Sequence, residues 1–141
     1  MTDRPPSLLY AVKQVELAVR SHLDDLLRAD GITALQYTAL TVLQRGDHVT
    51  AAQLARNSFV TTQSTADLVG ALERRGLISR ERDTTDRRRV HLTLTPAGER
   101  LVAEQATPVA ELESRMVAAL TSEQVTAFRE ALNASRAALA D

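Results

Sequence analysis

The sequence contains no cysteine, no tryptophan and no long apolar run. Without cysteine the chain cannot form a disulfide, a thiolate nucleophile or a zinc site built on thiolates. Its five glycines form neither a G-x-G-x-x-G nor a P-loop pattern, so no glycine-rich phosphate cradle is expected. No stretch reaches the roughly 20 apolar residues that a membrane span needs, and the polar N-terminus is unlike a signal peptide. We therefore expect a cytoplasmic protein without a membrane partner.

Charge is distributed unevenly along the 141 residues, although the net charge is only −1. Residues 74–89 hold seven arginines and three acidic residues, so this segment carries +4 and the remainder carries −5. A local positive field on an acidic body suits docking to a polyanion such as nucleic acid. A solvated arginine-rich loop is the alternative interpretation. The length and the 44% hydrophobic content are those of one globular domain, here taken as residues 1–141.

Helical periodicity dominates the first half of the chain. Apolar residues at steps of three and four predict a long amphipathic helix from about residue 8, ending near Gly31. The pairs Thr33-x-x-Gln36 and Thr50-x-x-Gln53 are capping boxes, which predict the starts of two further helices. A fourth amphipathic helix is expected from Thr61 or Thr62 to Gly76.

The periodicity changes after Gly76 from that of a helix to that of a strand. Val90, Leu92 and Leu94 alternate with His91 and Thr93, as on a strand with one buried face and His91 on its polar side. The polar segment 80–89 would join this strand to an earlier one. We expect a mainly α fold with a small β-hairpin wing (α+β), in which residues 32–95 form a winged helix-turn-helix.

Two further helices follow the hairpin. Thr95-Pro96 predicts the start of the first, and Pro108 should kink or divide it. Thr121-x-x-Gln124 opens the last helix. The helices in 7–30 and 96–141 need a cover for their apolar stripes, either by packing within one chain or by interleaving with a second copy. Because a short chain buries a small share of its own surface, we expect these to be the dimerisation helices of a homodimer.

Three motifs resemble the multiple-antibiotic-resistance regulator (MarR) family. They are Val49-Thr-x-x-Gln-Leu-Ala55, Leu72-Glu-Arg-Arg-Gly-Leu-Ile-Ser-Arg80 and Asp86-Arg-Arg-x-Val-x-Leu-x-Leu-Thr-Pro-Ala-Gly98. The resemblance implies a homodimer with interlocking terminal helices and two winged lobes that contact double-stranded DNA. It implies a repressor of a near-palindromic operator, released by a small aromatic or phenolic effector. The alternative is a winged-helix protein-interaction module that does not bind DNA specifically.

The fourth helix would be the recognition helix of such a protein, entering the major groove with residues near its N-terminus. The candidate DNA-binding residues are Thr61, Thr62, Gln63, Ser64 and Asp67. Gln63 could bind adenine through two hydrogen bonds, whereas Thr61 suits an N-cap. Asp67 departs from the arginine or lysine that relatives often carry. It could change the operator preference, weaken binding or pair with a nearby arginine.

The wing supplies the second set of candidates. Arg87 and Arg88 match the basic tip that the family lays along or into the minor groove. The resemblance implies that Asp86 holds a wing arginine in place, and that Arg80 pairs with Asp86 or with a phosphate. Residues 74–75, at the end of the predicted fourth helix, suit the helix dipole as well as DNA.

Effector and catalytic sites are harder to find in the sequence. His22, Tyr37 and Arg45 lie on the first two helices, near where relatives place a ligand, and are the candidate ligand-binding residues. His48 and His91 are far apart in sequence and have no evident carboxylate partner, so we expect no metal site. The serines and histidines lie on separate elements and offer no nucleophile with a base and an orienting group. We therefore expect neither an enzyme nor a cofactor.

Overall fold

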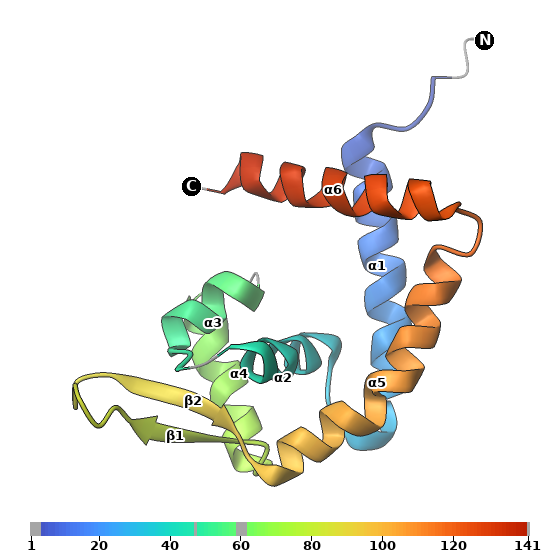
Figure 1. The fold of residues 1–141 in the computed structure, drawn as a ribbon. Helices are drawn as coiled ribbons and strands as arrows, with labels where there is room; N and C mark the ends of the chain where they lie inside the picture. Colours follow the sequence, from blue (N-terminus) through green and yellow to red (C-terminus); the bar gives the residue numbers. More distant parts are fainter. Residues whose placement is uncertain (1–3, 47, 59–61, 141) are drawn as a thin grey trace. The chain divides into compact units, whose positions relative to one another are not determined.

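The computed structural model describes residues 4–46, 48–58 and 62–140. The elements are α1 (Leu8–Leu27), the short 3-10 helix η1 (Arg28–Asp30), α2 (Ala34–Arg45), α3 (Ala51–Ser58), α4 (Thr62–Arg74), β1 (Ile78–Arg82), β2 (Val90–Leu94), α5 (Pro96–Met116) and α6 (Ser122–Leu139) (Figure 1). The chain divides into a first unit that ends at residue 106 and a second that begins at residue 107. The fold is mainly α with one small hairpin, as predicted.

Side-chain caps begin the helices at the expected places. In each capping box the threonine hydroxyl accepts from the glutamine backbone N–H, and the glutamine side chain accepts from the threonine N–H. The three boxes are Thr33 with Gln36, Thr50 with Gln53 and Thr121 with Gln124. Gly31 and Gly76 adopt left-handed φ angles of 69° and 71° where the sequence predicted helix ends.

The core of the first unit lies where α2, α3 and α4 meet the base of the hairpin. Its largest fully buried side chains are Leu27, Leu40, Leu54, Thr65, Val69 and Leu72. Burying an aliphatic side chain of this kind contributes roughly 1.5–3 kcal/mol to folding. The buried residues of α4, Thr65, Val69 and Leu72, recur at steps of four and three, as expected of an amphipathic helix. This core therefore fixes α4 with its opposite face toward solvent.

The hairpin β1–β2 is antiparallel, with Ile78 opposite Leu94, and projects from the helices of the first unit (Figure 1). Val49 forms an isolated bridge to Leu92 and accepts its N–H at 2.8 Å. The predicted alternation of β2 is wrong at His91, a residue that is only 5% exposed. The segment leading to Val49 runs beside β2, and His48 contacts His91 there.

Helix α5 runs through Pro108 without a break. The proline therefore does not divide the helix, since its ring fixes a φ compatible with helix and removes only one backbone donor. Leu101 and Val102 anchor the start of α5 in the core of the first unit. In the described part of the second unit no side chain is fully buried. None of the helices formed by the described residues is long and apolar enough to cross a membrane.

Two helical glycines give opposite predictions for stability. A Cβ on Gly98 would clash with the backbone carbonyl oxygen of Leu77, whereas a Cβ on Gly70 would meet only the flexible end of Arg74, at 3.3 Å. We expect Gly98→Ala to lower the free energy of unfolding by about 1–3 kcal/mol, because backbone must move. Gly70→Ala should leave it unchanged or raise it by up to about 1 kcal/mol through helix propensity. Urea denaturation at one fixed protein concentration measures both, and equal effects would contradict this account of Gly98.

Candidate nucleic-acid interface

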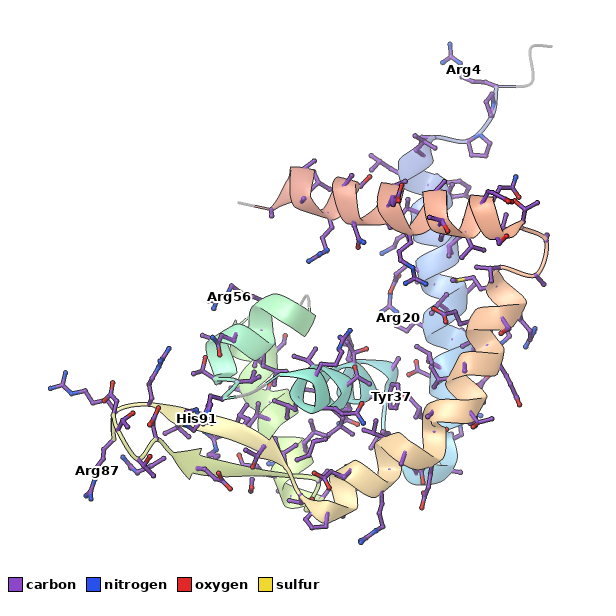
Figure 2. The ribbon with its side chains drawn as sticks, in the orientation of Figure 1. Arg4, Arg20, Tyr37, Arg56, Arg87 and His91 are labelled. Carbon is purple, nitrogen blue, oxygen red and sulfur yellow. The ribbon has the colours of Figure 1, made fainter. Side chains whose placement is uncertain are left out.

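The wing, residues 78–94, carries a cluster of exposed arginines. They are Arg80, Arg82, Arg87, Arg88 and Arg89. Arg87 lies at the far end of the hairpin and points away from the helices (Figure 2). A guanidinium group presented in this way can reach a phosphate or enter a narrow groove.

Acidic side chains organise the backbone of the wing tip, residues 83–89. Asp83 Oδ1 accepts from the backbone N–H of Thr85 at 2.9 Å and from its hydroxyl at 2.8 Å. Asp86 accepts from the backbone N–H of Arg88 at 3.1 Å. These bonds fix the turn through its main chain, so the guanidinium groups of Arg87 and Arg88 stay exposed at the tip.

One of the two predicted partnerships in the wing is present in the structure and the other is different. Asp86 does hold a wing arginine, through the backbone N–H of Arg88. Arg80 Nε donates to Glu73 Oε1 at 2.7 Å instead of pairing with Asp86. The reason is position, since Arg80 lies in the middle of β1, beside the end of α4, while Asp86 lies in the distant turn. Glu73 thus ties the wing to α4.

His48, His91 and Asp83 meet at the base of the wing tip, which overturns the expectation that the two histidines are separate and lack a carboxylate. Nε2 of His91 lies 3.2 Å from Nδ1 of His48 and 3.5 Å from Oδ2 of Asp83. The left-handed backbone of His48, with φ of 56°, precedes the bridge that Val49 makes to β2. Among the described residues no group of three or more such side chains has an arrangement suited to a metal ion. The cluster instead links the wing tip to the segment that leads into α3.

The exposed face of α4 carries part of the predicted base-reading set. Gln63, Ser64 and Asp67 lie exposed on its first turns, while Thr65 between them is buried. Asp67 is four residues after Gln63 and three after Ser64, and helical positions at these spacings lie on the same side of a helix, so Asp67 can reach one surface together with each of them. Thr61 lies outside the described residues, and so does the side chain of Thr62.

Arg74, which ends α4, and the following Arg75 are both exposed but have different surroundings. Arg75 donates from its guanidinium to the backbone carbonyls of Asp30 and Gly31. It therefore caps the end of another helical segment, a role that neither of the sequence-based interpretations included. Arg74 is exposed.

The three candidate effector residues differ in their exposure to solvent. His22 and Arg45 are exposed, whereas Tyr37 is buried, and burial raises the pKa of the Tyr37 hydroxyl. An open groove does lie between α1 and α2, but it is lined by other residues, among them Leu9, Val12, Lys13, Arg20 and Leu35. Arg20 and Glu16, which both lie on α1, form an ion pair at 2.8 Å.

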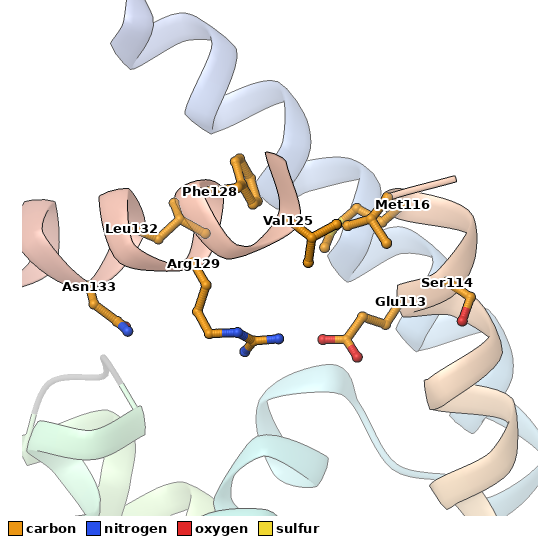
Figure 3. A pocket seen from close by; sticks show the side chains of 9 residues that line it. Glu113, Ser114, Met116, Val125, Phe128, Arg129, Leu132 and Asn133 are labelled. Carbon is orange, nitrogen blue, oxygen red and sulfur yellow. The ribbon is translucent and has the colours of Figure 1, made fainter. Parts of the chain in front are cut away.

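The second unit has an apolar groove of its own, between the end of α5 and the first turns of α6 (Figure 3). Its apolar side chains include Met116, Val125, Phe128 and Leu132. Glu113 and Arg129 face each other across it (Figure 3). Sequence periodicity predicted the apolar face of α6, and the structure shows that this face remains open to solvent in one chain.

Comparison with known proteins identifies the family. The sequence model of the MarR family matches residues 30–89. The HTH-type transcriptional regulator YsmB of Bacillus subtilis is 28% identical over 140 residues, covering 94% of this chain and 93% of its own. An HTH-type transcriptional repressor of Mycobacterium tuberculosis is 27% identical over 132 residues and covers 94% of each chain. The chain is a transcriptional regulator of the MarR family.

The likeness of this MarR-family regulator to a solved structure extends over its whole fold. MepR of S. aureus, in a structure of its complex with DNA, superposes with a TM-score of 0.85 at 26% identity. The match covers 96% of this chain and 100% of the MepR chain. The predicted family and fold class are thereby confirmed.

Asp83 provides a prediction for the wing turn. The backbone N–H and the hydroxyl of Thr85 hold the pKa of Asp83 at about 2, below the ordinary 3.8. Because folding favours the ionised carboxylate, this contribution to stability is complete above pH 3.8 and is lost as the pH falls through about 2. Thr85→Val removes one donor and should raise the pKa of Asp83 toward 3.8, as followed by the NMR shift of the carboxyl carbon. Thr84→Val is the control and should leave it at about 2, and a wild-type midpoint near 3.8 would show that these bonds are not formed.

Proposed function

We propose that this MarR-family regulator represses transcription by binding a near-palindromic operator in double-stranded DNA as a homodimer. The observation that carries the proposal is the joint presentation, on one packed unit, of an exposed first turn of α4 and an arginine-bearing wing. The structure of the MepR–DNA complex, a relative of the same fold, supports the assignment of DNA as the partner. We infer a regulatory and non-catalytic role, exercised in the cytoplasm where the chromosome is accessible.

The recognition helix would read bases in the major groove. We assign this role to Thr61, Thr62, Gln63, Ser64 and Asp67. A glutamine amide matches the donor and acceptor of adenine, and hydroxyl groups suit phosphates or either base. Asp67 is exposed one turn into α4, where a carboxylate would accept from cytosine N4 and be repelled by phosphate. We therefore infer that Asp67 contributes base preference rather than affinity.

The wing would contact the backbone and the minor groove through Arg87 and Arg88. Their exposure at the tip supports this role, and the bond from Asp86 to the backbone of Arg88 would hold the tip in place. Arg80 would be a weaker contributor, because its pairing with Glu73 already offsets its charge. The wing and the helix together would span adjacent grooves.

Exposed apolar side chains support the homodimer. Leu8 and Leu9 of α1 are 84% and 81% exposed, and Leu139 of α6 is 81% exposed. Phe128 and Leu132, which line the groove of the second unit, are also open to solvent in one chain. An apolar surface of this extent is costly in water, at about 25 cal/mol for each Å². A second copy offers the same surfaces and can cover them with twofold symmetry.

A small aromatic or phenolic acid is the proposed effector. The groove between α1 and α2 combines apolar walls with the cationic Lys13, which suits a ring that carries a carboxylate or phenolate. His22, Tyr37 and Arg45 lie on the same two helices but do not line this groove. If the effector binds there, these three act on it from outside the groove or not at all.

Arg88→Ala tests the proposed function. We expect the variant to stay folded and to lose operator binding by at least about tenfold, because one phosphate or minor-groove contact is worth roughly 1–3 kcal/mol. Fluorescence anisotropy with a labelled operator duplex measures the loss at several salt concentrations. Because the homodimer loses one Arg88 on each half-site, the slope of log affinity against log salt should become shallower by about two.

Arg100→Ala is the matched control for this test. Arg100 is exposed on α5, outside the wing and α4, and its replacement removes the same charge. We expect it to bind the operator nearly as the wild type does. Equal losses in the two variants would show that net charge alone, and not the wing, drives the binding.

A further inference from the structure

The short turn at Asp30 and Gly31 joins three helices of the first unit. Helix α1 runs directly into it through η1. Arg75, the residue after α4, donates to the carbonyls of both turn residues. Gln105 of α5 donates through Nε2 to the carboxylate of Asp30 at 2.5 Å. The ends of the recognition helix, α1 and the first part of α5 are therefore tied to one another at this turn.

The two carbonyl oxygens of the turn suit a guanidinium group. The carbonyls at the end of a helical segment lack partners within it, and a guanidinium fork can donate to two of them at once. Gly31 has φ of 69°, and a Cβ at this position would lie 2.9 Å from Nη1 of Arg75. Glycine is thus required both by the backbone conformation and by the space that the guanidinium group occupies.

The connection through Arg75 is long-range and specific. Its two acceptors lie 44 and 45 residues earlier in the sequence. The neighbouring Arg74 is the last residue of α4 and is exposed. Both arginines are exposed, and Arg75 reaches back from the end of the helix to bind the turn.

We propose that Arg75 is a positioning residue that sets the spacing between the two recognition helices of the homodimer. This inference rests on the proposed function. In a homodimer on a palindrome, the two recognition helices must enter successive major grooves, about 34–36 Å apart. With α1 among the helices that join the copies, the spacing depends on how each α4 is held to its own α1 and α5. The Arg75 and Asp30 bonds fix that relation.

The test measures spacing preference separately from affinity. An operator is selected from random duplexes with the full-length wild-type protein. Binding is then compared on this duplex, on the same duplex with one base pair inserted at its centre, and on a single half-site. The variant is Arg75→Gln, and Arg74→Gln is the control with the same loss of charge at the adjacent position.

The expected result is a loss of discrimination by Arg75→Gln. The wild type and Arg74→Gln should prefer the selected spacing over the lengthened one by about tenfold or more, since an inserted base pair shifts and rotates one half-site. For Arg75→Gln the preference for the selected spacing over the lengthened one should fall to about threefold or less. Its affinity for the single half-site should change by no more than about threefold. A merely structural role for Arg75 would lower binding to all three duplexes together.

Gln105→Ala keeps the inference testable if Arg75→Gln fails to fold. This substitution removes the hydrogen bond from Gln105 to Asp30. The preference of the variant for the selected spacing should therefore also decline. The inference is overturned if a folded Arg75→Gln protein, or in its absence Gln105→Ala, keeps the wild-type preference. If the wild type selects no duplex, both the proposed function and the inference about Arg75 fail. If it selects one and the variants discriminate as it does, only the inference about Arg75 fails.

Discussion

The packing of α4 against α2, α3 and the base of the hairpin is the interaction on which the rest of the first unit depends. Val69 and Leu72 are buried on one side of α4, and this leaves Gln63 and Asp67 on the other side in water. The same core holds β2 through the bridge between Val49 and Leu92. The helix proposed to read bases and the wing proposed to grip the backbone are therefore parts of one packed body.

Charge is arranged on that body by hydrogen bonds to the main chain. Asp83 and Asp86 accept hydrogen bonds from backbone N–H groups of the turn, so they shape the wing tip without pairing with its guanidinium groups. Glu73 does pair with an arginine, Arg80, and that pair lies at the inner part of the wing. A protein with a net charge of −1 can thereby present a cationic tip. The long uncovered helices supply the complementary feature, a surface suited to a second copy of the chain.

Features that depend on near neighbours in sequence were predictable. The three capping boxes and the helix ends at Gly31 and Gly76 arise from contacts within a few residues, and the hairpin follows from a change of periodicity. The Asp83 turn has a readable signal as well, since an aspartate two residues before Thr85 favours such a turn. Contacts between distant segments were not predictable. His91 is buried because a segment more than 40 residues earlier covers it, and a pattern of polar and apolar residues contains no information about that partner.

Sedimentation velocity of the full-length protein, alone and with a selected operator duplex, tests the central claim most directly. The account predicts a dimer in the absence of DNA and a complex of two chains with one duplex, which dissociates steeply as salt is raised. A folded monomer that stays monomeric at micromolar concentration, or a complex of one chain with one duplex, would contradict it.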